Sequence, residues 1–253
     1  MNGHRQQFCD IWEKKHMSTS GKSNKGGSRP SSNPSGRGGL KVRVKTARGR
    51  SNSSARWLQR QLNDPYVQEA KKRGYRGRAA FKIAQIDDKF NLLKKNSRIV
   101  DLGCAPGGWC QVAVERCGPG ARIVGFDLQE VEPIAGVILL QGDFMEDDAP
   151  ARLKEALNGP ADLVLSDMAA AASGHPQTDH LKIMGLVETA LMFADEVLVP
   201  GGSFVAKVLQ GGAQSELLKL VKTKFKSVKH FKPDSSRKDS SEMFMVATGF
   251  KES

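Results

Sequence analysis

Two lysines stand in apolar runs of the sequence, where a charge is costly. Lys207 interrupts the run SFVAKVL, and Lys82 interrupts the run AAFKI. Lysine is rarely buried in a protein unless it is paired or functional. Two carboxylates occupy comparable positions, because Asp167 follows one apolar run and Glu242 precedes another. On neighbouring strands of one sheet, Asp167 and Lys207 would lie close together, so these four residues form a candidate catalytic constellation.

A glycine-rich turn is a second candidate site. The segment VDLGCAPGGW at residues 100–109 has the spacing Asp-x-Gly-x-x-x-Gly, and glycines such as Gly103 and Gly107 let a ligand approach the backbone. This spacing differs from the dinucleotide fingerprint Gly-x-Gly-x-x-Gly, and the Gly-Lys-Ser/Thr of a phosphate-binding loop is missing. Asp101 would be unfavourable beside a pyrophosphate. It suits the cationic amino-acid end of S-adenosylmethionine, directly or through water.

Carboxylates also follow the next two apolar runs. Asp127 comes 20 residues after Gly107, where a carboxylate can accept hydrogen bonds from both ribose hydroxyls of a nucleoside. Asp143 can accept from the exocyclic amine of adenine. Each aspartate alone is equally well explained as a helix cap or a turn residue. Three carboxylates at the ends of three successive strands favour the nucleoside site, and S-adenosylmethionine is the expected cofactor.

The spacing of the apolar residues predicts the elements that must position these groups. Short apolar runs bounded by Gly, Pro or Asp indicate strands at 98–102, 122–127, 137–141, 162–166, 203–208, 227–231 and 243–248. Helices are expected between them at 108–117, 149–157, 179–199 and 213–225, and before them near 54–62, 65–70 and 81–86. Alternating strands and helices predict an α/β, doubly wound, mostly parallel sheet. Ligands then bind beyond the carboxyl ends of the strands.

The positive charge is concentrated near the N-terminus. The formal net charge is +12, and residues 1–56 hold 13 Lys/Arg but only 2 Asp/Glu. Residues 18–39 are all Ser, Thr, Gly, Asn, Pro, Lys or Arg, which cannot bury apolar surface. We predict a disordered basic tail over residues 1–52 and one domain over residues 53–253, and we hypothesise a true start at Met17. Such a tail suggests RNA or DNA as a partner, although a solubilising tail is the alternative.

Other classes of protein are disfavoured. No apolar run reaches the roughly 18 residues of a membrane span, and the first 17 residues lack the apolar centre of a signal peptide. The four cysteines form no CxxC pair and have no histidine cluster beside them, so no metal site is predicted. We expect a cytoplasmic protein without a membrane partner, and a monomer.

A series of collinear motifs resembles one known family. They are SARWL, RGRAAFK, DLGCAPGGW, LQGDF, SDM, PGGSFVAKV, KPDSSR and VATG. From about residue 53 to 249 the chain resembles the FtsJ/RrmJ family of ribose 2′-O-methyltransferases, and within it the bacterial enzymes for large-subunit ribosomal RNA. The resemblance implies the Rossmann-like methyltransferase fold, a seven-stranded sheet with an antiparallel last strand. It also implies that Trp109 and Asp167 contact S-adenosylmethionine, and that Lys82, Asp167, Lys207 and Glu242 are the catalytic tetrad.

The implied reaction is methyl transfer to the 2′-O of a uridine ribose in 23S ribosomal RNA, with the 50S subunit as partner. The ribose hydroxyl must lose its proton, and a neutral Lys207 could accept it, since burial and nearby Lys82 disfavour its charged form. Asp167 and Glu242 would orient the lysines but oppose that effect. Alternatively, Lys207 stabilises the developing alkoxide while water carries the proton.

The sequence also departs from the family pattern. The family usually has Ala-Pro-Asn after Asp167, where this chain has Met168 followed by alanines, and Gly77 replaces a residue that is usually serine. Two other functions stay open, namely the same chemistry on tRNA or another RNA, and a non-catalytic RNA-binding factor for ribosome assembly. A small-molecule methyltransferase is disfavoured by the basic tail and the basic stretch at 71–78. The loop spacing disfavours a dehydrogenase.

Overall fold

The computed structural model describes residue 59 and residues 61–170, 174–210 and 215–252. The predicted tail at 1–52, the suggested start at Met17 and most of the predicted helix at 54–62 lie outside the described residues and stay predictions. None of the described helices combines the length and the apolar character that a bilayer span requires.

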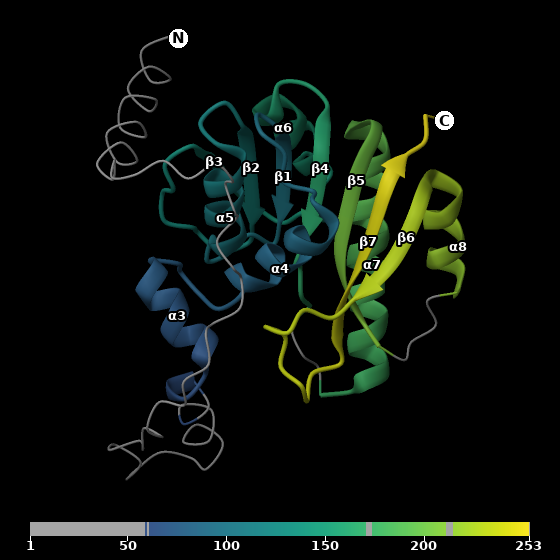
Figure 1. Ribbon diagram of the computed structural model, residues 1–253. Coiled ribbons are helices and arrows are strands. Elements are labelled where there is room, and N and C mark those ends of the chain that lie inside the picture. The colour runs from purple at the N-terminus through teal and green to yellow at the C-terminus, as the bar shows by residue number, and fades with distance from the viewer. Residues whose placement is uncertain (1–58, 60, 171–173, 211–214, 253) are drawn as a thin grey trace.

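Seven strands form one sheet in the order β3-β2-β1-β4-β5-β7-β6 (Figure 1). The strands are β1 (Arg98–Leu102), β2 (Arg122–Asp127), β3 (Val137–Gln141), β4 (Ala161–Ser166), β5 (Leu198–Leu209), β6 (Phe225–Phe231) and β7 (Glu242–Phe250). The first five pair in parallel, whereas β7 lies between β5 and β6 and is antiparallel to both. The predicted α/β sheet with an antiparallel last strand is therefore confirmed.

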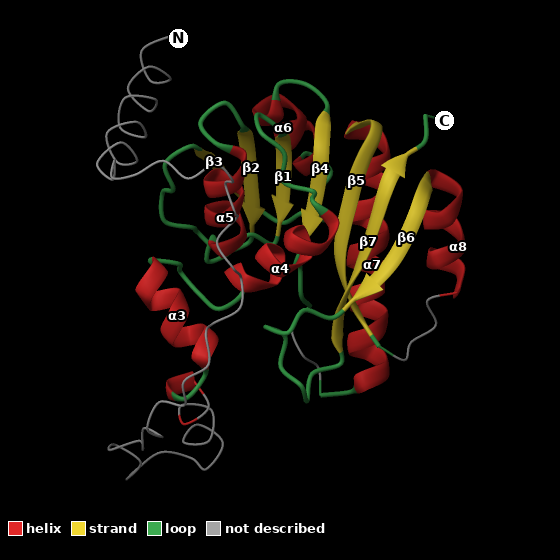
Figure 2. Ribbon diagram, in the orientation of Figure 1, coloured by secondary structure: helices red, strands yellow, loops and turns green. Residues whose placement is uncertain are grey.

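Helices cover both faces of the sheet (Figure 2). The helices are α3 (Pro65–Arg73), α4 (Ala80–Phe90), α5 (Gly108–Cys117), α6 (Ala149–Leu157), α7 (Pro176–Val197) and α8 (Ser215–Lys224). The buried apolar residues of α6, α7 and α8 belong to one cluster, and most of those of α4 and α5 belong to another. Local signals set the ends of α3, because the Asp64 carboxylate accepts from the Tyr66 N–H at 2.9 Å, and Gly74 ends the helix with φ +73°.

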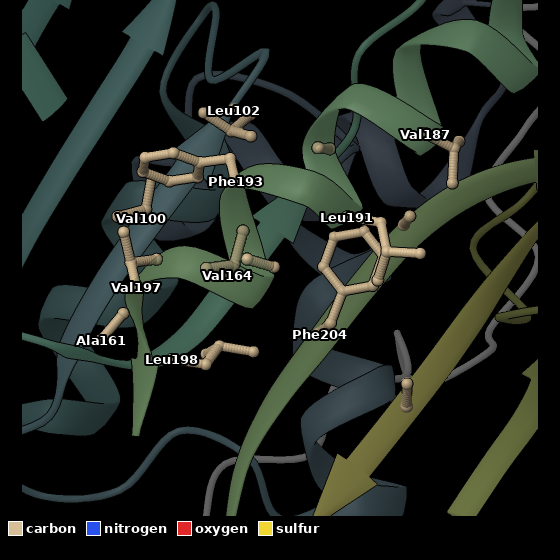
Figure 3. Packing of buried hydrophobic residues seen from close by; sticks show 14 of the residues in the cluster. Val100, Leu102, Ala161, Val164, Val187, Leu191, Phe193, Val197, Leu198 and Phe204 are labelled. Atoms are coloured by element: carbon tan, nitrogen blue, oxygen red, sulfur yellow. The ribbon is translucent and has the colours of Figure 1, made fainter. Parts of the chain in front are cut away.

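Alternation along the strands divides the core into these two layers. In β1, Val100 and Leu102 belong to the layer beneath α7, whereas Ile99 belongs to the layer beneath α4 and α5. Figure 3 shows Phe193 and Val197 of α7 beside strand residues of the first layer. Successive strand residues thus pack against helices on opposite faces of the sheet. This packing fixes the carboxyl edge of the sheet, where the candidate site residues lie.

The structure differs from the predicted elements mainly at β5. This strand begins at Leu198, five residues before the predicted start, and α7 ends at Val197 rather than at 199. The segment Pro200-Gly201-Gly202 is expected to interrupt a strand, but β5 continues through it with a register shift opposite β4. Gly201 adopts φ +85°, which accommodates this irregularity.

Candidate active site

A pocket of about 240 Å³ opens at the carboxyl ends of the parallel strands. Its lining comes from the end of β2, from the segments that follow β1, β2, β3 and β4, and from Leu186 of α7. Three carboxylates, Asp127, Asp143 and Asp167, line it, and none of the described lining residues is a lysine or an arginine. A phosphate-bearing ligand would be repelled here, whereas a ligand with hydroxyl, amine or ammonium donors would be favoured.

The glycine-rich turn after β1 forms one wall of this pocket. Gly103 has φ +75°, and a Cβ at this position would lie 2.8 Å from the Met168 backbone, so only glycine fits. The N–H groups of Gly103 and Cys104 donate to the Phe126 carbonyl at 2.8 and 3.2 Å, which ties the turn to the end of β2. Gly107, at φ +106°, is the residue before the start of α5 and does not line the pocket.

Asp127 and Asp143, the expected acceptors for ribose and adenine, both line the pocket, and both also organise the backbone. Asp127 accepts from the N–H groups of Ala105 and Gln129, each at 2.9 Å, and Asp143 accepts from the Met145 N–H at 2.9 Å. A carboxylate oxygen has two lone pairs, so these bonds leave acceptor positions for a ligand. The role of these side chains in the turns therefore does not exclude a role in binding.

Asp101 and Trp109 lie away from the pocket surface. Asp101 is 1% exposed and accepts a hydrogen bond from the Cys110 thiol at 3.1 Å. Burial raises the pKa of Asp101 to about 7, the Cys110 hydrogen bond opposes this shift, and the negative charges of Asp167 and Asp127 add to it. The Trp109 ring packs against Phe244 with its Nε1–H donating to the Ala79 carbonyl at 2.9 Å, so in this structure it joins α5 to α4.

The four candidate catalytic residues meet at the edge of the pocket. Lys82 Nζ lies 2.7 Å from Glu242 Oε2 and 3.7 Å from Asp167 Oδ2. Lys207 Nζ lies 3.1 Å from Asp167 Oδ1 and donates to the Asp167 carbonyl oxygen at 2.6 Å. These side chains are only 10–17% exposed. Asp167 therefore contacts both lysines and also lines the pocket.

Topology explains how these distant residues converge. Asp167 directly follows β4, and Lys207 lies near the carboxyl end of the neighbouring strand β5. Because β7 is antiparallel, its first residue, Glu242, reaches the same edge and pairs in register with Leu209. Lys82 lies in the first turn of α4, which packs on the face of the sheet and brings this turn to the same edge.

A loop that sequence reasoning did not assign to the site holds Glu242 in place. The Ser236 hydroxyl donates to Glu242 Oε1 at 2.9 Å. The carbonyl of the preceding Ser235 accepts from Arg78, and its N–H donates to Gln85 Oε1 at 2.9 Å. Burial opposes ionisation of Glu242, but the charge and hydrogen bond of Lys82, the Ser236 hydroxyl and the charge of Lys207 together lower its pKa. The motif KPDSSR was the available signal, although it did not indicate which serine would reach Glu242.

Comparisons with known proteins identify the family of this chain. Residues 75–250 match the model of the FtsJ-like methyltransferase family. The ribosomal RNA large subunit methyltransferase E of Paramagnetospirillum magneticum is 58% identical over 93% of this chain and 98% of its own, and that of Erythrobacter litoralis is 64% identical over 83% and 94%. A crystal structure described as a ribosomal RNA methyltransferase from Plasmodium falciparum is 32% identical, covers 71% of this chain and all of its own, and superposes with a TM-score of 0.63. The chain belongs to the FtsJ-like methyltransferase family.

Proposed function

We propose that this chain transfers a methyl group from S-adenosylmethionine to the 2′-O of a uridine ribose in 23S ribosomal RNA of the large subunit. The observation that carries the proposal is Asp167, which lines the pocket and contacts both Lys82 and Lys207. A methyl donor in the pocket would therefore lie beside the two lysines. The names of the relatives, which specify large-subunit ribosomal RNA, support the substrate class.

The described pocket suits S-adenosylmethionine. Asp127 and Asp143 offer acceptors for ribose hydroxyls and an adenine amine, and the apolar side chains of Phe126, Phe144 and Leu186 offer a surface for the base. The bound cofactor supplies a methyl group on a positively charged sulfur. We propose that Asp101 also contributes to the cofactor site, because its Oδ1 is buried and has no hydrogen-bond partner among the described residues.

The proposed catalytic task of the tetrad is to hold the ribose oxygen and manage its proton. Lys207 Nζ donates a hydrogen bond to the Asp167 carbonyl oxygen and lies 3.1 Å from the Asp167 carboxylate. Toward the substrate, Nζ can offer a lone pair in the neutral amine or a further N–H in the ammonium. The first form accepts the ribose proton, whereas the second stabilises the developing alkoxide while water takes the proton. We propose that Lys82 and Glu242 keep Asp167 and Lys207 in this arrangement.

The test is methyl transfer from labelled S-adenosylmethionine to large subunits that lack the modification. Wild type is compared with Lys207→Ala and with a control, Lys219→Ala, which removes an exposed lysine of α8. We expect label on one uridine ribose with wild type and the control, and at least roughly a hundredfold loss with Lys207→Ala, as for removal of a group that acts on the proton. Label on tRNA alone would show that tRNA, rather than ribosomal RNA, is the substrate. Cofactor binding without methyl transfer to any RNA would favour the non-catalytic assembly factor.

A further inference from the structure

A larger pocket, of about 640 Å³, lies at the opposite end of the sheet. It is bordered by the end of α4 and the loop after it, by the beginning of β5, and by β6 and β7. The end of α4 contacts β6 beside this pocket, because the rings of Phe90 and Phe231 pack edge to face. We call this pocket the lysine groove, and none of the candidate catalytic or cofactor residues lines it.

The floor of the lysine groove is a row of hydroxyl side chains on three adjacent strands. Ser203 of β5 pairs with Thr248 of β7, and Thr248 pairs with Ser227 of β6. Alternate residues share a face of a sheet, so Lys207 of β5 lies two rows further along this same face. At about 3.3 Å per residue, the hydroxyl row is roughly 13 Å from the candidate catalytic lysine.

The walls of the groove are positively charged. Lys89, Lys94, Lys95 and Lys229 line it, and all four are exposed. Its only acidic lining residue among those described is Asp162, whose carboxylate accepts from the Arg98 N–H at 2.7 Å. Within the described part of the chain, no carboxylate lies within ion-pair distance of the four lysines. Exposed ammonium groups above a row of hydroxyl donors suit the oxygens of phosphate groups.

We propose that the lysine groove binds the phosphodiester backbone of the substrate RNA, close in sequence to the methylated ribose. The inference rests on the proposed function, because it takes the occupant to be the same RNA. Charge complementarity favours this occupant, and the basic residues 1–56 of this chain would be repelled. A separation of roughly 13 Å corresponds to at least about four nucleotides of a stacked strand. The sheet face between the groove and Lys207 is buried beneath α4, so an RNA segment that contacts both must pass around this helix.

The test removes charge from the groove in the full-length chain. The groove variant carries Lys94→Ala and Lys229→Ala, and the control carries Lys219→Ala and Lys222→Ala, two exposed lysines of α8. Binding of an oligouridylate of about 20 nucleotides is measured by fluorescence anisotropy across a range of salt concentrations. Each lost phosphate contact lowers the slope of log affinity against log salt by about 0.7 on single strands. We expect the slope of the groove variant to fall by about 1.4, and its affinity at about 0.1 M salt to fall about 25-fold.

Methyl transfer to unmodified large subunits is measured with the same proteins. We expect the groove variant to raise KM for the subunit at an unchanged kcat, and the control to match wild type. Oligouridylate binding equal to wild type in affinity and slope would overturn the inference. Unchanged oligouridylate binding with weaker association with subunits would also overturn it, because the groove would then contact a ribosomal protein. If the wild type methylates no RNA but its binding to RNA still depends on the groove lysines, the proposed function is refuted and RNA binding by the groove is not.

Discussion

Replacing Asp101 by asparagine tests whether the buried carboxyl group of Asp101 destabilises the folded protein once it is charged. The carboxyl group is 1% exposed, and burial raises its pKa from 3.8 to about 7. The unfolded chain therefore releases this proton near pH 4, whereas the folded protein keeps it until about pH 7. Between these values the native state binds more protons than the unfolded state, so this group lowers the free energy of unfolding as the pH rises.

The magnitude follows from the size of the shift. A difference of about 3 pKa units corresponds to about 4 kcal/mol, of which about 3 kcal/mol is lost between about pH 5 and pH 8. Asparagine keeps an acceptor for the Cys110 thiol but does not titrate. Its amide nitrogen would replace an oxygen that has no partner among the described residues, at a cost of about 1–3 kcal/mol that does not change with pH. We therefore expect the stability of Asp101→Asn relative to wild type to improve by about 3 kcal/mol from about pH 5 to pH 8.

Urea denaturation at several pH values measures this difference, and tryptophan fluorescence, to which the 3% exposed Trp109 contributes, reports unfolding. The same substitution at exposed Asp147 controls for the loss of one carboxyl group. Parallel stability curves for wild type and Asp101→Asn would refute the reasoning. They would mean that the Asp101 carboxyl loses its proton at the same pH in both states.

Three further substitutions test other contacts. Ser236→Ala removes the hydroxyl that orients Glu242, so we expect kcat to fall about tenfold with the KM for S-adenosylmethionine unchanged, in steady-state methylation assays. Asp87→Ala leaves the largely buried Arg116 without its 2.5 Å partner, and we expect a loss of about 3–5 kcal/mol in urea denaturation. Gly103→Ala forces a methyl group against the Met168 backbone at positive φ, and we expect at least about 2 kcal/mol of destabilisation and weaker cofactor binding by calorimetry.

Matched variants separate these effects from general damage. Ser236→Thr keeps the hydroxyl and should restore much of kcat, and a Ser236→Ala protein with wild-type kcat would contradict the positioning role. Asp88→Ala removes the more exposed partner of Arg116 and should cost less than Asp87→Ala. Gly185→Ala is the control for Gly103→Ala, because a Cβ there would meet open space within a helix. Equal stability of the two alanine variants would show that the Gly103 turn relaxes.

Much of the site can be read from the sequence alone. Runs such as RIVDL and ADLVLS identify strands by local apolar character, and the aspartates that follow such strands necessarily fall at the carboxyl edge of a parallel sheet. The positions of Asp127, Asp143 and Asp167 at the pocket therefore follow from local sequence patterns and the parallel topology. Lys207 stands out because a charge inside an apolar strand is costly unless it is used.

The tertiary structure decided which side chains meet and which are hidden. Lys82 reaches Glu242 across 160 positions of the chain because β7 is antiparallel and inserted between β5 and β6. Local patterns gave no sign that Ser236 would reach Glu242, that Trp109 would pack against Phe244 or that Asp101 would lose contact with solvent. Burial and contact depend on segments far apart in the chain, whereas periodicity and turn chemistry act over a few residues. The lysine groove also depends on segments far apart in the chain, because its row of hydroxyl side chains forms only when β5, β7 and β6 pair in register.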